Sequence, residues 1–205
     1  TPVPEADAIR LVHESIDMGI NFIDTANVYE GYDRVLGSAG GVAEEITGKA
    51  IADRRDSVVL ATKVGGPLGP GPQDRGLSPL HIEREIEASL RRLGTDVIDL
   101  YIVHWPDRHT PLESTLEALD RVVRQGKARY IGCSNYPVYK VMEALWTSDK
   151  RNLESFACLQ YNYSLLARWE TELELMPMAH EFGLGIMAYS PLAIGLLTGR
   201  FRRGQ

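Results

Sequence analysis

The hydrophobic pattern along the chain switches repeatedly between the spacing of a helix and that of a buried strand. Between residues 4 and 18, Ile9, Val12 and Ile16 recur at helical spacing and share one face. The short apolar run Asn21–Thr25 then predicts a strand. The same pair of patterns repeats to the end of the sequence.

The later segments are assigned by the same rule. Further strands are expected at Ser57–Thr62, Val97–Val103, Arg129–Cys133, Ala157–Leu159 and Gly185–Ala188. Further helices are expected at Val42–Asp53, Ser78–Gly94, Thr110–Gly126, Pro137–Asp149 and Thr171–Phe182. Six strands that alternate with six helices indicate βαβ units and a parallel sheet.

The fold class is therefore α/β, and we expect a (β/α)8 TIM barrel with about six of its eight βα units present. A doubly wound open sheet is the alternative at this length. No linker divides the chain, so residues 1–205 are expected to form a single, incomplete barrel domain. The Gly- and Pro-rich stretch 65–76 lies inside one connection, as a surface loop or a loop over the active-site mouth.

Composition and charge limit the possible partners and location of the protein. The net charge of −6 argues against a nucleic-acid partner, and no apolar run is long enough to span a membrane. The first residues do not resemble a signal peptide. Cys133 and Cys158 have neither disulfide nor metal spacing and are expected to be buried free thiols, so we expect a cytoplasmic protein without a metal.

Polar residues gather where the predicted strands end. In a parallel barrel, these ends share the face that carries the chemistry. Each residue alone has an ordinary explanation, such as capping or packing, but the series along one face favours a site. The other histidines, at positions 13, 81, 109 and 180, are expected on the surface. The strand-end residues are Asp24, Lys63, His104, Ser134, Asn135, Gln160, Tyr189 and Ser190.

Four of the polar side chains suit the reduction of a carbonyl group. Tyr29 could protonate the carbonyl oxygen, although a tyrosine pKa near ~10 needs tuning. The Lys63 ammonium would lower that pKa, and Asp24 would hold the lysine in place. His104 could donate a hydrogen bond that orients the carbonyl.

Several segments resemble motifs of the aldo-keto reductase family. NFIDTANVY at 21–29 resembles the motif with the catalytic Asp and Tyr, ATKVG at 61–65 the lysine strand, and DLYIVHW at 99–105 the histidine strand. YIGCSN at 130–135, LQYN at 159–162, AYSPL at 188–192 and GLLTG at 195–199 are similar to segments around the nicotinamide. The resemblance covers essentially the whole chain.

The resemblance implies a hydride transfer between NADPH and an aldehyde or ketone. Tyr29 would be the general acid, Lys63 and Asp24 would tune it, and His104 would position the carbonyl. Trp105 would line the substrate pocket, beside Tyr29 and His104. The residues that the resemblance assigns to the NADP(H) site are Asp24, Ser134, Asn135, Gln160, Tyr189, Ser190 and Leu192.

The sequence also departs from the family's pattern. The family's first barrel strand would precede Thr1, and its last strand, with the residues for the adenosine 2′-phosphate, would follow Gln205. We therefore expect a part of a longer protein, and the choice of NADP over NAD rests on the resemblance. The segment Glu30–Gly41 is longer than in many members, so the resemblance does not define the pocket wall at this segment.

Three other functions stay open. A Schiff-base aldolase could use Lys63 as its nucleophile on a similar barrel. A nicotinamide-binding subunit of a potassium channel would bind the cofactor with little turnover, although no apolar patch on the outer helices is evident in the sequence. The chain could also be an inactive fragment. A small carbonyl compound is the expected partner, and a monomer is compatible with the charge.

Overall fold

In the described part of the chain, six parallel strands form one sheet whose spatial order follows the sequence. The structure, a computed structural model, describes residues 3–30 and 38–201. Over these residues β1 pairs only with β2, and β6 only with β5. The two edge strands of this described sheet do not pair with each other, so the curled sheet does not close into a barrel. This half-barrel is the expected part of a (β/α)8 barrel, not a doubly wound sheet. The strands are β1 (Phe22–Asp24), β2 (Val59–Val64), β3 (Ile98–Val103), β4 (Ala128–Ser134), β5 (Phe156–Asn162) and β6 (Gly185–Tyr189).

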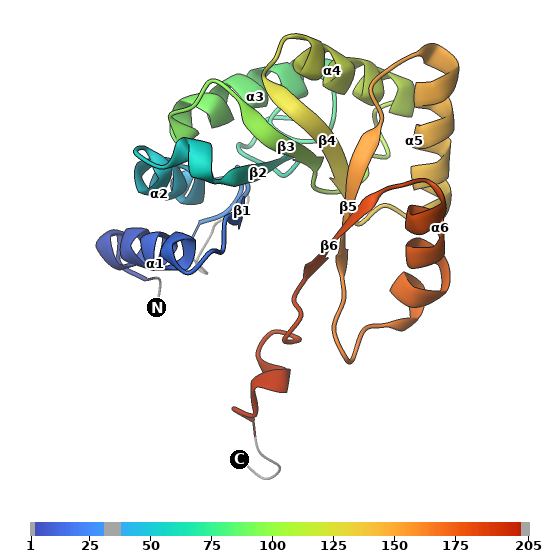
Figure 1. Cartoon of the computed structure of the whole chain (residues 1–205). Helices are drawn as coiled ribbons and strands as arrows, with labels where there is room; N and C mark the ends of the chain where they lie inside the picture. The colour runs from blue at the N-terminus through green and yellow to red at the C-terminus, as the bar shows by residue number, and fades with distance from the viewer. Residues whose placement is uncertain (1–2, 31–37, 202–205) are drawn as a thin grey trace.

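Helices cover the convex side of the sheet, and neighbouring helices pack against each other in chain order from α1 to α5 (Figure 1). The segment after β6, which includes a short 3-10 turn at Leu196–Thr198, projects away from the sheet. Within the described ranges, no helix has the length and apolar character that a membrane span requires. The helices are α1 (Glu5–Asp17), α2 (Val42–Ile51), α3 (Pro79–Leu93), α4 (Leu112–Arg124), α5 (Val138–Arg151) and α6 (Met176–Glu181), with a 3-10 turn at Arg55–Ser57 and a π-helical turn at Thr171–Leu175.

Alternation along each strand divides the side chains between two faces. In β3, Tyr101 and Val103 pack into the large core beneath the helices, whereas Leu100 and Ile102 belong to a small cluster on the concave face. In β2, Leu60 belongs to the helix-side core. The same alternation therefore sends the last polar residue of several strands to the concave face.

Four strands, β2, β4, β5 and β6, extend beyond the carboxyl ends that their apolar patterns predicted, whereas β1 is shorter than predicted. Lys63 lies inside β2 instead of after it, and Gln160 lies inside β5. Ser134 and Tyr189 are the last residues of β4 and β6. The physical reason is that the ladder joins backbone groups, so it continues past the point where side chains change from apolar to polar.

The helix expected at residues 171–182 forms with a local irregularity. A π-helical turn at Thr171–Leu175 precedes α6, and Pro177 occupies the first turn of α6. Proline cannot donate to the carbonyl four residues earlier and clashes with it, which a wider turn relieves.

Three expectations about single residues need correction or limits. His81, expected on the surface, is wholly buried on α3, because it lies on the same buried face of this helix as Glu85. Both cysteines are free, as predicted, but only Cys133 is fully buried and Cys158 is half-buried on the concave face. Of the long segment 30–41, residues 31–37 lie outside the described residues, so its effect on the pocket wall stays a prediction.

We predict a contrast between two apolar residues of α3. Ile82 is fully buried beneath the helix, whereas Leu80 is 58% exposed. Ile82→Ala should lower the free energy of unfolding by about 2–5 kcal/mol, because it leaves a cavity. Leu80→Ala should change it by less than about 0.5 kcal/mol. Urea unfolding followed by circular dichroism measures both, and equal losses would contradict this assignment of the core.

Candidate active site

Lys63 and Asp24 form an ion pair on the concave face of β1 and β2. The Lys63 Nζ donates to Asp24 Oδ2 at 2.7 Å and to the carbonyl oxygen of Thr25 at 2.8 Å. The lysine side chain is completely buried, and the Asp24 side chain is 30% exposed. Burial lowers the pKa of Lys63, and the Asp24 charge opposes that shift. The structure thus brings together the two residues that the sequence paired.

Amide and hydroxyl side chains extend this pair across the sheet. Gln160 Nε2 donates to Asp24 Oδ2 at 3.1 Å, and Ser134 Oγ donates to the Gln160 carbonyl at 2.9 Å. Asn135 Nδ2 donates to Ser134 Oγ at 2.9 Å. Tyr189 OH in turn donates to Asn135 Oδ1 at 2.7 Å. Residues from β1, β4, β5 and β6, far apart in sequence, therefore meet in one hydrogen-bonded group.

Tyr29, His104 and Trp105 form the aromatic side of the site. The Tyr29 and His104 rings meet edge to face, with centroids 5.7 Å apart. Trp105 stacks on His104 at 3.6 Å between centroids. Lys63 Nζ lies 4.7 Å from the centre of the Tyr29 ring. A carbonyl group could therefore approach Tyr29 and His104 together, which is what orientation and protonation require.

The expected lowering of the Tyr29 pKa is not found. Burial, followed by the charge of Asp24 and by Tyr189, raises the pKa of Tyr29 to about 12. Lys63 is already paired with Asp24, so the pair carries little net charge that could stabilise a phenolate. Tyr29 therefore keeps its proton at neutral pH, as a proton donor must.

Two of the proposed cofactor residues lie apart from this group. Ser190 and Leu192 follow β6, where their carbonyl oxygens accept backbone bonds from Ala193 and Gly195. Asn135 and Ser190, directly after β4 and β6, both adopt the left-handed conformation, with φ of 60° and 53°. Such backbone is uncommon for residues other than glycine and often occurs at functional sites.

The structure adds three contacts that the sequence motifs did not indicate. Thr25 provides the second acceptor for Lys63 through its backbone. Asn135 Nδ2 also donates to the His104 carbonyl at 3.1 Å. Asn27, two residues before Tyr29, is completely buried and donates to Glu85 of α3 at 3.4 Å. In the sequence, the only sign of this contact was a polar residue inside the motif at 21–29.

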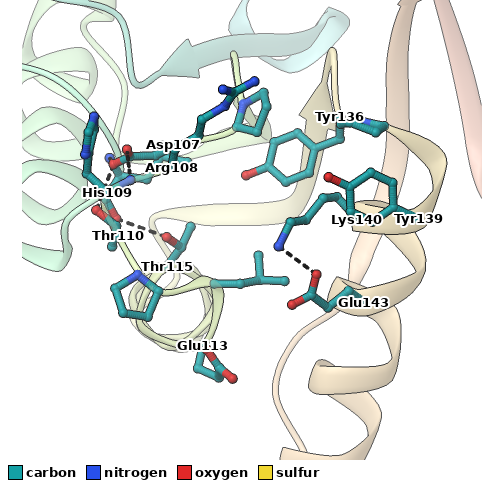
Figure 2. A pocket seen from close by; sticks show the side chains of 15 residues that line it. Asp107, Arg108, His109, Thr110, Glu113, Thr115, Tyr136, Tyr139, Lys140 and Glu143 are labelled. Atoms are coloured by element: carbon teal, nitrogen blue, oxygen red, sulfur yellow. Dashed lines mark hydrogen bonds and ion pairs between the residues drawn. The ribbon is translucent and has the colours of Figure 1, made fainter.

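Three cavities surround the strand ends. One of about 870 Å³ is lined in part by Asn135 and Tyr189. Another of about 910 Å³ lies between Trp105 and the 65–76 stretch, which supports the interpretation of that stretch as a loop near the site. The third, of about 630 Å³, lies between Asp107 and Lys140, outside the Lys63 group (Figure 2).

Comparison with known proteins identifies the family. The model of the aldo/keto reductase family matches residues 1–205. The chain belongs to the aldo/keto reductase family. It is 45% identical over 203 residues to "Uncharacterized oxidoreductase YrpG" of Bacillus subtilis (strain 168), covering 96% of this chain and 60% of that protein.

Two plant members of the same family carry a different description. Each is named "Probable voltage-gated potassium channel subunit beta". The Arabidopsis thaliana protein is 39% identical over 191 residues, covering 92% of this chain and 55% of its own length. The Oryza sativa subsp. japonica protein is 38% identical over 202 residues, covering 97% and 58%. The chain thus spans less than two thirds of these relatives, and it resembles both an oxidoreductase and channel subunits.

We predict that Asp24→Asn destabilises the protein by about 3 kcal/mol at neutral pH, because it leaves Lys63 charged and buried. This is the lower end of the range for a broken buried pair, since the Asp24 side chain is 30% exposed. Urea unfolding at several pH values measures it. The matched control is Glu83→Gln, which breaks an exposed pair with Arg121 and should have little effect.

The pH dependence of this loss has a definite sign. Without Asp24, the folded-state pKa of Lys63 should lie further below its ordinary value of 10.5. Between the folded-state pKa of the variant and that of the parent, only the folded variant has released the proton that the unfolded chain still binds, so its stability rises with pH relative to the parent. The deficit of Asp24→Asn should therefore shrink as the pH rises through this interval, which lies below 10.5. A deficit that grows over this range contradicts the assignment.

Proposed function

We propose that the protein is an NADP-dependent reductase that transfers a hydride between NADPH and an aldehyde or ketone. The observation that carries the proposal is the convergence of Tyr29, His104 and the Lys63–Asp24 pair on one concave face. Tyr29 donates the proton to the carbonyl oxygen, and His104 orients that oxygen. Trp105 contributes an apolar wall beside His104.

The donor set fits a nicotinamide carboxamide. An amide group needs both donors and acceptors, and Ser134, Asn135 and Gln160 offer both within one hydrogen-bonded group. The Tyr189 ring is held by Asn135 and is available to stack on a planar ring. When bound, NADPH would supply the hydride, while these residues would fix which face of the ring is presented. Asp24, Ser190 and Leu192 complete the proposed cofactor residues.

Burial, with a smaller effect of the Asp24 charge, keeps Tyr29 protonated and so able to donate. Since the pKa of Tyr29 is raised to about 12, the phenol is protonated over the whole neutral range. The bound carbonyl and cofactor must then draw the proton from Tyr29 as the oxygen gains charge. In the oxidising direction, the same phenol must first lose its proton, which favours reduction at neutral pH.

A regulatory, nicotinamide-binding role is the second candidate. The two relatives described as potassium channel subunits favour it. Cofactor binding without appreciable turnover would distinguish that role from a reductase. The aldolase hypothesis has less support, because Lys63 is completely buried and its ammonium form is paired with Asp24. Borohydride trapping of a carbonyl compound on Lys63 would revive it.

We predict that Tyr29→Phe lowers kcat for NADPH-dependent reduction of an aromatic aldehyde roughly 10²- to 10⁴-fold. NADPH affinity should change little, because the substitution removes only the phenol oxygen. Loss of NADPH absorbance and equilibrium binding, both on the full-length protein, measure the two quantities. Equal turnover by Tyr29→Phe and the parent would refute Tyr29 as the donor. Binding without turnover by the parent would favour the regulatory role.

We predict a graded effect at Tyr189. Tyr189→Ala should weaken NADPH binding roughly 2- to 10-fold, because it removes the stacking ring. Tyr189→Phe keeps that ring and loses only the hydrogen bond to Asn135, so its Kd should lie closer to that of the parent. Titration of intrinsic fluorescence with NADPH provides both constants. Two unchanged constants would place the nicotinamide elsewhere.

A further inference from the structure

Buried charged side chains lie on the helix side of β2, behind the loop that carries Tyr29. Arg92 of α3 donates from Nε to Glu44 Oε2 at 2.6 Å, and its Nη2 lies 3.7 Å from Glu85 Oε2. Glu44 is completely buried, and Glu85 is 5% exposed. A carboxylate buried in this way requires a cationic partner; Glu85 also pairs with Arg84 at 3.3 Å, whereas Glu44 of α2 pairs with Arg92 of α3, so this pair joins the two helices.

The arrangement reaches the Tyr29 loop through the start of α2. Glu44 lies in the first turn of this helix. The neighbouring backbone N–H of Ala43 donates to the Tyr29 carbonyl at 3.0 Å, and that of Gly41 donates to the Asn27 carbonyl at 2.7 Å. By fixing Glu44, Arg92 therefore also fixes the start of α2, which in turn holds the backbone of Tyr29.

A second route runs through side chains. Asn27 donates from Nδ2 to the same Glu85 Oε2 that Arg92 approaches, at 3.4 Å. Arg92 thus touches both routes, one through Glu44 and the other through Glu85. Thr62, adjacent to Lys63 in β2, also donates to Glu44 Oε1 at 2.6 Å, which ties the strand carrying Lys63 to the same carboxylate.

Close packing leaves this region little room to adjust. Gly41 has a φ of +88°, and a Cβ there would meet Arg92 Cδ at 2.5 Å. Gly40 has a φ of +64°, and its Cβ would meet the Asn27 carbonyl oxygen at 2.3 Å. A displacement of the Arg92 side chain would therefore also displace the backbone of the loop that carries Tyr29, because the packing leaves no free space.

We propose that Arg92 is a positioning residue for Tyr29, acting through Glu44 and the start of α2 and through Glu85 and Asn27. Arg92 places the phenol relative to His104 and Lys63 without touching substrate or cofactor. The inference rests on the proposed function, in which Tyr29 donates the proton. The hydrogen bond from Arg92 Nε to Glu44 fixes direction as well as distance, and the 3.7 Å ion pair to Glu85 adds an attraction; an apolar side chain of the same size provides neither.

The test compares Arg92→Met with Arg91→Met, its exposed neighbour on α3, in the full-length protein. We expect Arg92→Met to lower kcat for aldehyde reduction on the order of 10- to 100-fold, with little change in the Kd for NADPH. Arg91→Met should leave both unchanged. In a Tyr29→Phe background, Arg92→Met should cause no further loss, because the residue it positions is already disabled.

Several outcomes would overturn the proposal. A full additional loss in the Tyr29→Phe background, or a parallel loss of NADPH affinity, would mean that Arg92 supports the fold in general. An unchanged kcat in Arg92→Met would mean that Arg92 does not position Tyr29. If Arg92→Met does not fold, Glu85→Gln retains the volume and weakens one route, and the same comparisons decide with a smaller expected loss.

Hydrogen exchange separates this proposal from the proposed function. Amides of a peptide covering residues 25–30 should exchange faster in Arg92→Met than in Arg91→Met, whether or not the protein reduces aldehydes. Faster exchange in a protein without turnover would sink the reductase function and keep the positioning role. Turnover in the parent, with exchange and kcat both unaffected by Arg92→Met, would sink the positioning role alone.

Discussion

The ion pair between Lys63 and Asp24 is the interaction on which the rest of the site depends. A charged lysine with no exposed surface is costly unless a fixed anion lies beside it, and Asp24 provides one at 2.7 Å. The same carboxylate oxygen accepts from Gln160, and the chain of bonds continues through Ser134 and Asn135 to Tyr189. Removal of Asp24 would thus remove direct contacts to Lys63 of β2 and Gln160 of β5.

Packing and chemistry are separated by the two faces of one sheet. The helix side of β2 and β3 is mostly apolar and supplies the core that holds the strands, with polar groups at Glu44–Arg92 and at Asp99–Arg55. The concave side carries Lys63 and the amides. Gly132 in β4 illustrates how tightly these strands approach, since a Cβ there would meet the Cys158 carbonyl at 2.6 Å. A shift of one strand would therefore also move the polar side chains on the concave face.

The fold and the candidate site were accessible from the sequence to different degrees. Alternation of helix and strand patterns predicted all six strands, because burial on both faces leaves long apolar runs. Their ends were misplaced at Lys63 and Gln160, because polarity marks the site and not the end of the backbone ladder. His81 was misplaced because one histidine in a helix carries no sign of the face it occupies.

The sequence by itself determined the fold class, the family and the identity of the residues that meet on the concave face. Those follow from local periodicity and from motifs, which need no knowledge of distant contacts. Only the tertiary structure decided the electrostatics. The pKa of Tyr29 is raised and not lowered, because burial and Asp24 outweigh a lysine whose charge is already paired. The Arg92 contact to Glu44 likewise exists only after α2 and α3 pack, since Glu44 lies in α2, 48 positions before Arg92 in the chain.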